Sequence, residues 1–541
     1  MSATRAGPAP SPAPTTARPR SIALVGLPGS GKTTLGRGLA ERLGWEFRDT
    51  DHEITRATGR SPAEIIDTDG EGAFRRLEAA TVIDLLRSDL PLVIACGGGL
   101  FAEEAPSRRL LRSAWVAALD APDAALLRRI VGGEDRPLLR GDAPGRIAEL
   151  RRRRERAHAR AHVHLDTERT PLEAAEAALC ALADSVSVPL PGGAYPVIVG
   201  AGATDHLAIH LPASCRRVAI VTDRAVASFA RRLAGVIRAS GRQPHVIALT
   251  AGEAVKSWAS AGRLLDGLAG LGLGRADALV AVGGGTIGDT AGFAAAAYCR
   301  GIAWIVVPTT LLAMVDRAIG GKTGVNLRVA KNLAGAFWQP RAVLADPTLL
   351  DTLPRRELAS GLGEIVKYAM IAEGDLAGLL DCCLDRAIAG DVHTLTAVIE
   401  RCAAIKAEVV GRDPLEGGGR AVLNYGHTVA HAIEAATGFG PVTHGEAVAA
   451  GMRVAGRISV EMTGLPEEDL RWQDGLLDRI DLAPLPAIDP AAVLQRLGHD
   501  KKSVGGEPRW VLLARRGEPR LGQRVPPDLV RAALEEVLST P

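Results

Sequence analysis

Three histidines and one glutamate could together hold a metal ion. His427 and His431 lie four residues apart in a segment that we expect to be helical, which puts both imidazoles on one helix face. His444 follows at loop distance, and Glu364 lies upstream. Such side chains suit a divalent metal, although two ordinary helical histidines are the open alternative. Thr428 after the first histidine excludes the His-Glu-x-x-His pattern of zinc proteases.

A glycine-rich segment near the start of the chain could hold phosphates. The apolar run 21–25 predicts a strand that leads into Gly26-Leu-Pro-Gly-Ser-Gly-Lys-Thr-Thr34 and then a helical pattern. In this strand-loop-helix context the motif predicts a site for a nucleoside triphosphate with Mg²⁺. Backbone N–H groups would converge on the phosphates, Lys32 would reach the terminal ones and the Thr33 hydroxyl would face the metal.

Charged residues after this motif could bind a second, smaller substrate. They are Asp49 and Asp51 after a predicted strand, Arg75, the glycines 97–99 at the end of the predicted strand 92–96, and Arg136. Arginine forks bind carboxylates, and an aspartate accepts hydrogen bonds from hydroxyls. The set therefore suits a small polyhydroxylated acid.

In order and spacing, these residues resemble shikimate kinase from about Ser21 to Ala183. The resemblance implies an α/β fold of the nucleoside-monophosphate-kinase type, phosphoryl transfer from ATP, and Arg136 as the residue that stabilises the transferring group. The open alternative is a degenerate ATP-binding module. Residues implied to bind shikimate are Asp51, Arg75, Gly98, Gly99 and Arg154; those implied for ATP and Mg²⁺ are Gly29, Gly31, Lys32, Thr33, Thr34, Asp49 and Arg129. Arg154 lacks the proline-leucine-tyrosine run that usually follows it, so a solvated basic helix face is its alternative.

The second half contains a dinucleotide-type turn. Gly283, Gly285 and Gly288 follow a predicted strand and open a predicted helix, which is the geometry that binds a pyrophosphate. The acid expected about 20 residues later is missing, because Pro308-Thr309-Thr310 stands there. Many lysines and arginines follow around the candidate metal ligands. This inventory favours a phosphorylated carboxylic acid as substrate.

From about Gly193 onward the chain resembles 3-dehydroquinate synthase. The shared motifs include Gly-Glu-x-x-Lys at 252–256, Pro-Thr-Thr-Leu-Leu, Gly-Gly-Lys-Thr, Gly-His-Thr and His-Gly-Glu-Ala-Val. The resemblance implies that Glu364, His427 and His444 bind the metal, zinc or another divalent ion such as cobalt. It also implies that His431 serves catalysis instead. Residues implied to line NAD are Asp223, Glu253, Lys256, Gly284, Gly285, Asp289, Thr309, Thr310 and Lys331. Residues implied to meet substrate are Arg300, Asp316, Lys322, Asn332, Lys367, Lys406, Arg420, Asn424, Lys501 and Lys502, with Asp316, Lys322 and Lys367 catalytic.

The implied reaction converts a heptulosonate phosphate to 3-dehydroquinate with release of phosphate and regeneration of NAD. A metal-dependent polyol dehydrogenase is the alternative. One departure is Arg317, where the family has a small residue; its side chain could touch substrate, but we expect it to face outward. The family also implies a homodimer formed through this half.

The composition limits the other possibilities. The 64 basic and 62 acidic residues nearly balance and aromatics make up 3%, which excludes a nucleic-acid binder. Seven scattered cysteines and the lack of a long apolar run indicate a reduced, cytoplasmic protein without a membrane span. We predict a disordered tail 1–20, for which a transit peptide is the open alternative, a kinase domain 21–184 and a Pro/Gly/Ser-rich linker 185–193. An NAD-binding α/β domain 194–353 and a mostly helical metal domain 354–541 would follow.

Overall fold

The computed structural model describes residues 20–97, 99–130, 142–250, 252–328, 331–438, 440–497 and 508–538. Arg20, the last residue of the predicted tail, belongs to the fold. It donates hydrogen bonds to Ser187 Oγ (2.8 Å) and to the Leu111 carbonyl oxygen (3.0 Å), and it lies over the Trp115 ring. The remainder of the predicted tail lies outside the described residues.

The first part of the chain is a parallel five-stranded sheet of order β2-β3-β1-β4-β5, surrounded by helices. The central strands β1, β3 and β4 are apolar and almost entirely buried, as expected for a sheet covered on both faces, whereas the edge strand β2 is polar and only half-buried. The strands are β1 (Ser21–Gly26), β2 (Glu46–Asp49), β3 (Leu92–Ala95), β4 (Ala114–Asp120) and β5 (Val163–Asp166). The helices are α1 (Lys32–Leu43), α2 (Thr50–Thr58), α3 (Pro62–Asp69), α4 (Glu71–Leu85), α5 (Glu104–Ser113), α6 (Asp123–Ile130), α7 (Ala143–His158) and α8 (Leu172–Ala183).

The middle part contains a seven-stranded sheet of order β6-β7-β14-β11-β10-β8-β9, parallel except for the β6–β7 pair. Its strands are β6 (Val186–Leu190), β7 (Gly193–Val199), β8 (Arg217–Asp223), β9 (Gln243–Leu249), β10 (Ala278–Gly283), β11 (Ala303–Pro308) and β14 (Val343–Ala345). Helices α9 (Leu207–His210), α10 (Ala227–Ala239), α11 (Trp258–Gly270) and α12 (Gly285–Ala297), the π-helical turn η6 (Ala313–Arg317) and the hairpin β12 (Lys322–Val325) and β13 (Ala334–Phe337) complete it.

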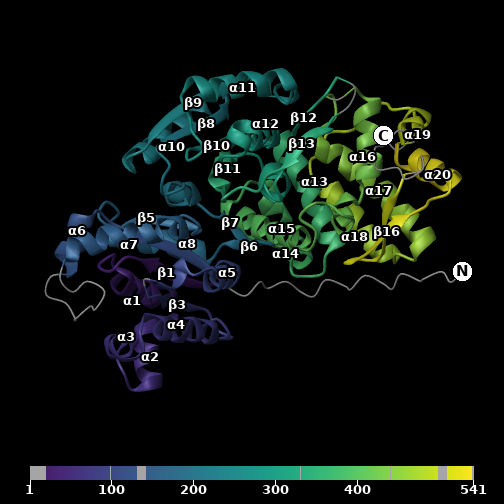
Figure 1. Cartoon of the computed structure of the whole chain (residues 1–541). Helices are drawn as coiled ribbons and strands as arrows, with labels where there is room; N and C mark the ends of the chain where they lie inside the picture. Colours follow the sequence, from purple (N-terminus) through teal and green to yellow (C-terminus); the bar gives the residue numbers. More distant parts are fainter. Residues whose placement is uncertain are drawn as a thin grey trace, which may run out of the picture.

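The last part is mostly helical, as predicted. Its helices are α13 (Arg355–Ile371), α14 (Leu376–Ile388), α15 (Val392–Arg412), α16 (His427–Ala436), α17 (His444–Thr463), α18 (Glu467–Arg479), α19 (Pro490–Leu497) and α20 (Pro527–Leu538). The hairpin β15 (Trp510–Arg515) and β16 (Glu518–Gln523) precedes α20. In Figure 1 this part, in green and yellow, lies beside the teal middle part, and the purple and blue first part lies below the sheet of the middle part. The predicted fold class is confirmed.

Part of the predicted linker 185–193 is a β-strand instead of a loop. Residues Val186–Leu190 form strand β6 at the edge of the large sheet, paired with β7. Valine, serine, valine, proline and leucine alternate there, and proline is tolerated in an edge strand because its missing N–H can face away from the ladder. The two enzyme-like halves are therefore joined through an ordered strand.

Among the described residues, no helix combines the length and the apolar character that crossing a lipid bilayer would require.

Candidate functional site

Three helices of the last part bring the predicted metal ligands together. Glu364 lies on α13, His427 begins α16 and His444 begins α17. Oε1 of Glu364 lies 3.3 Å from Nε2 of His427 and 3.1 Å from Nε2 of His444. One ligand atom of each residue lies within 4.8 Å of the others. Two imidazoles and one carboxylate that leave further positions open are typical of catalytic zinc sites.

The far sides of both imidazoles are also held. Nδ1 of His427 lies 3.2 Å from the carbonyl oxygen of Tyr425, and Nδ1 of His444 lies 3.4 Å from Oε1 of Glu434. Such partners fix which nitrogen carries the proton and leave Nε2 for a metal. Burial alone would lower the pKa of His444, but its hydrogen bonds to Glu364 and Glu434 raise that pKa above its ordinary value. The donor set fits a divalent metal.

His431 stands apart from this group. Its ring lies 5.7 Å from the His427 ring and 6.4 Å from the His444 ring, centroid to centroid, yet the cluster of possible ligands does not include it. The helical spacing of four residues thus brings His431 beside the candidate metal ligands but outside the cluster that they form.

Two buried lysines balance the carboxylates next to this cluster. Nζ of Lys367 lies 2.6 Å from Oε2 of Glu364, and Nζ of Lys406 lies 2.6 Å from Oδ1 of Asp316. The Tyr368 hydroxyl donates to the same Asp316 oxygen at 2.9 Å. Burial would raise the pKa of Asp316, but Lys406 and Lys367 hold that pKa well below its usual range. Burial lowers the pKa of Lys406 to about 7. No motif in the sequence indicated Tyr368, because its partner Asp316 is distant along the chain.

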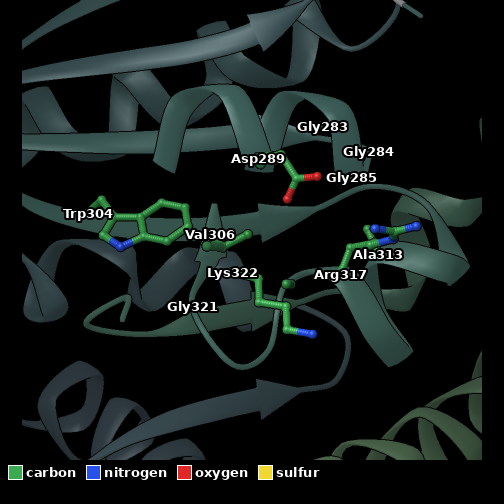
Figure 2. Close-up of a pocket in the computed structure, with 12 residues that line it drawn as sticks. Gly283, Gly284, Gly285, Asp289, Trp304, Val306, Ala313, Arg317, Gly321 and Lys322 are labelled. Carbon is green, nitrogen blue, oxygen red and sulfur yellow. The ribbon is translucent and has the colours of Figure 1, made fainter. Parts of the chain in front are cut away.

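The glycine turn opens helix α12 at the carboxyl end of β10. Figure 2 shows Gly283, Gly284 and Gly285 beside a small pocket, with the Asp289 carboxylate directed into it. Nζ of Lys256 lies 2.5 Å from Oδ2 of Asp289. Thr309 donates its backbone N–H to the carbonyl oxygen of Gly283 at 3.1 Å. The N-terminus of α12 with its closely approachable glycines fits a pyrophosphate.

Other predicted cofactor residues surround this turn. Glu253 lies 3.3 Å from Nζ of Lys331 and accepts a hydrogen bond from Asn326 at 2.7 Å. Asp223 ends β8, the strand next to β10, where its carboxylate accepts from the backbone N–H of Ala225 at 2.8 Å. Thr310 lies against Gly284, where a Cβ would meet the threonine methyl group at 3.2 Å. The predicted cofactor residues of the second half therefore gather around the carboxyl ends of β8, β10 and β11.

The predicted substrate residues are divided. Lys322 pairs with Glu416 at 2.7 Å, and buried Arg420 donates to the carbonyl oxygen of Gly320 at 3.2 Å. Asn332 accepts from Lys256, and Asn424 lies three residues before His427. Arg300 is different: it precedes β11, at the opposite end of that strand from Thr309, with a left-handed φ of 62°. Arg300 thus lies at the amino end of β11, whereas Thr309 and the glycine turn lie at the carboxyl ends of their strands. Lys501 and Lys502 lie outside the described residues.

Arg317 lines the pocket, contrary to the expectation that it faces outward. The preceding residues form a π-helical turn, in which Ala318 donates its N–H to the carbonyl oxygen of Ala313, five residues back. The wider turn rotates the side chain toward Gly285. The helical period assumed from the sequence could not show this rotation.

The first half presents the predicted phosphate loop. Gly29 and Gly31 have φ values of 80° and 91°, and the loop ends at the start of α1. Nζ of Lys32 lies 3.2 Å from the carbonyl oxygen of Gly26, and the Thr33 hydroxyl donates to Oδ2 of Asp49 at 3.2 Å. Thr34 follows in α1 and is exposed. A threonine hydroxyl paired with an aspartate beside converging N–H groups fits Mg²⁺ with nucleotide phosphates.

Arg129 lies beside the phosphate loop as well. It pairs with Glu168 at 2.6 Å, and its Nη1 lies 3.4 Å from the carbonyl oxygen of Gly29. This position is compatible with the ATP-binding role that the resemblance implies. Arg136 and Gly98 lie outside the described residues.

A buried charge cluster lies next to the phosphate loop. Arg75 pairs with Glu78 at 2.6 Å, and a Cβ at Gly99 would lie 2.2 Å from the Arg75 guanidinium carbon. Arg154 is only 4% exposed, which excludes the solvated helix face. Its burial, with Arg75 nearby, lowers its pKa to about 10. Burial also raises the pKa of Glu78 to about 7, although Arg75 opposes this shift. Glu78 was not among the predicted site residues; its only signal was the i, i+3 spacing from Arg75.

Both halves of the chain match known protein families. Residues 28–183 match the family model "Shikimate kinase", residues 246–360 match "3-dehydroquinate synthase N-terminal", and residues 361–503 match "3-dehydroquinate synthase C-terminal". The 3-dehydroquinate synthase of Acidithiobacillus ferrooxidans is 43% identical over 357 residues, which cover 65% of this chain and 97% of the relative. The Bordetella pertussis enzyme is 42% identical over 359 residues, covering 65% and 99%.

A solved structure gives a similar result for the second half. A 2-deoxy-scyllo-inosose synthase complexed with carbaglucose-6-phosphate, NAD⁺ and Co²⁺ is 30% identical with a TM-score of 0.60, covering 65% of this chain and 99% of that one. A shikimate kinase from Acinetobacter baumannii in complex with shikimate is 36% identical, covering 30% and 92%, with a TM-score of 0.29. Together with the family models, the curated relatives place this chain in the 3-dehydroquinate synthase family, with a shikimate kinase domain fused before it.

Proposed function

We propose that the two activities of this fused enzyme are carried by the two residue clusters described above. The first half phosphorylates shikimate from ATP. The second half converts 3-deoxy-D-arabino-heptulosonate 7-phosphate to 3-dehydroquinate with release of phosphate. The observation that carries the second assignment is the cluster of Glu364, His427 and His444 within 4.8 Å. It lies beside two buried lysine–carboxylate pairs, whose lysines bring positive charge close to the metal position.

In the synthase half, Glu364, His427 and His444 would hold a divalent metal, and the turn 283–285 would hold NAD. When bound, the metal polarises a ring hydroxyl as a Lewis acid and NAD accepts and returns a hydride. Lys367 neutralises Glu364, while Lys406 and Tyr368 hold the Asp316 carboxylate in place. Lys322 and Arg420 supply positive charge for the carboxylate and phosphate of the substrate. The separate placement of His431 supports a role in contacting substrate.

In the kinase half, Lys32 and the N–H groups of the phosphate loop would position the triphosphate. Thr33 and Asp49 face one another at 3.2 Å and would hold Mg²⁺. Arg75 and Arg154 would bind the shikimate carboxylate, and Asp51 its hydroxyls. Phosphoryl transfer needs mainly such positioning and neutralisation of charge.

Two assays on one purified chain test the proposal. We expect phosphate release from the heptulosonate phosphate that needs only catalytic NAD⁺ and stops on chelation of metal. We expect shikimate phosphorylation that survives chelation of zinc in excess Mg²⁺ and is lost in Lys32→Ala. Because each variant or treatment should leave the other activity intact, each half controls for the folding of the other. Accumulation of NADH with a polyol, without phosphate release, would instead support a polyol dehydrogenase.

We further propose a cytoplasmic homodimer formed through the synthase half. Large apolar side chains are exposed there on segments adjoining α12, among them Trp258 (63% exposed), Leu333 (54%) and Phe337 (40%). Exposed aromatic and aliphatic groups of this kind favour contact with another protein surface. Light scattering of the wild-type chain and of Trp258→Glu would test this. We expect twice the chain mass for the wild type and a loss of mass in the variant; a wild-type monomer would contradict it. We also propose the domain limits given above, and limited proteolysis tests them: 21–184, 194–353 and 354–541.

A further inference from the structure

The proposed reaction assigns no role to Arg317. Its stem lies on the glycine turn: a Cβ added at Gly285 would lie 2.9 Å from Cγ of Arg317 and 3.2 Å from its Cβ. The side chain is 34% exposed, so a ligand in the pocket can reach it. Figure 2 shows Arg317 next to Gly285 at one end of the pocket. Arg317 therefore lies against Gly285, the first residue of helix α12.

The described acidic groups around Arg317 accept no hydrogen bond from its guanidinium. Its nearest acidic partner is Asp316, whose Oδ2 lies 3.9 Å from Nε, too far for a hydrogen bond. Asp316 already binds Lys406, and Asp289 already binds Lys256. Burial would lower the pKa of Arg317, but the field of Asp289, Asp316, Glu364 and Glu434 raises it, so the side chain stays cationic. Within the described residues, the guanidinium has no hydrogen-bond acceptor at normal distance.

Its position at a helix start is itself informative. The first N–H groups of α12 carry partial positive charge, and a cation beside them is unfavourable unless an anion lies between. The glycine turn is also where a backbone lets a phosphate approach closely. A guanidinium binds phosphate oxygens with two parallel N–H donors, which suits a pyrophosphate better than a single carboxylate.

We propose that Arg317 binds the pyrophosphate of the dinucleotide together with the backbone of Gly284 and Gly285. This inference rests on the NAD-dependent synthase function and adds a cofactor-binding residue that the family pattern does not contain. A small residue at 317 leaves the pyrophosphate to the backbone alone. In this chain a cation adds to that site, and the affinity for the cofactor should become more dependent on salt.

Calorimetric titration of the full, metal-loaded chain tests the inference. The ligands are NAD⁺, ADP-ribose, which keeps the pyrophosphate but lacks nicotinamide, and adenosine, which lacks both. Arg317→Ser should weaken NAD⁺ and ADP-ribose binding by about tenfold or more, as expected for a lost charged hydrogen bond, and leave adenosine unchanged. Arg317→Lys should retain part of the affinity. Arg231→Ser, at an exposed arginine of α10, is the matched control and should change nothing.

The other outcomes overturn the inference. Unchanged or tighter ADP-ribose binding in Arg317→Ser would show that the side chain merely covers Gly285. Unchanged NAD⁺ and ADP-ribose binding with weaker binding of inorganic phosphate would assign the guanidinium to the substrate phosphate instead. If the wild-type chain binds no NAD⁺ at all, the synthase function fails, and this inference fails with it. Thermal unfolding of each variant separates loss of binding from loss of fold.

Discussion

Arg341 of the synthase half donates a hydrogen bond of 2.9 Å to the carbonyl oxygen of Ala161 in the kinase half. The same guanidinium donates to the carbonyl oxygens of His162 (3.2 Å) and His210 (2.8 Å). Burial lowers the pKa of Arg341 to about 10, so it stays charged near neutral pH. One side chain thus satisfies backbone oxygens from both halves at their contact.

Replacing Arg341 by alanine should loosen the contact between the halves. Buried carbonyl oxygens would lose their donors, which costs about 3 kcal/mol of the free energy of unfolding. Kinase and synthase activity, each measured after stepwise heating, should then be lost at separate temperatures, whereas the wild-type chain should lose them together. Arg231→Ala, at an exposed position of α10, should leave both temperatures in place. Joint loss of both activities in Arg341→Ala would contradict this role.

The sequence predicted best what depends on local backbone geometry. The phosphate loop and the turn 283–285 each need only a strand, a few glycines and a helix start, and all of these are contiguous in the chain. Residues 185–193 show the limit of composition, because proline, glycine and serine indicated a linker where alternating side chains form strand β6. These residues can be recognised as a strand only from their pairing with β7, and that pairing depends on the fold.

Site residues that depend on packing between distant segments were harder to predict. Arg154 and its exposed neighbours Arg152 and Arg153 have the same type and adjoin one another, yet only Arg154 is buried. Which of them faces inward depends on the rotation of α7. The direction of Arg317 depends on a π-helical turn that no motif indicates. Helical spacing indicated the histidines of the candidate metal cluster but also pointed to His431, which lies outside that cluster.

Gly445 controls the distance between the helices that carry Glu364 and His444. A Cβ at Gly445 would lie 1.9 Å from the carbonyl oxygen of Ser360 on α13. Gly445→Ala must therefore push α17 away from α13 and separate the ligands. We expect loss of stoichiometric metal and of synthase activity, with kinase activity retained. Gly475→Ala in α18, where a Cβ meets nothing within 4 Å, is the control. Full metal content in Gly445→Ala would contradict this account.

Glu78 should make the stability of the kinase half depend on pH. Burial raises its folded-state pKa from 4.5 to about 7. Below pH 4.5 the carboxyl is protonated in both states; between 4.5 and 7 the unfolded state loses the proton first, so stability falls as pH rises through this window. The loss is on the order of a few kcal/mol. Denaturant unfolding from pH 4.5 to 8 should show this fall in the wild-type chain and a flatter profile in Glu78→Gln. Equal profiles would mean that Glu78 is ionised in the fold.

His427 and His431 should separate metal binding from catalysis. His427→Ala removes a group 3.3 Å from Glu364, so bound metal and synthase activity should both fall steeply. His431→Ala leaves Glu364, His427 and His444 in place, so metal content should stay near the wild-type value while synthase activity drops by about a hundredfold or more, as for the loss of a general acid–base group. Metal is measured by elemental analysis of dialysed protein, and kinase activity in the same samples reports the fold. His393→Ala, at an exposed position of α15, should alter neither quantity. Loss of metal in His431→Ala would make this residue a ligand after all, and the three-residue cluster would then need a fourth member.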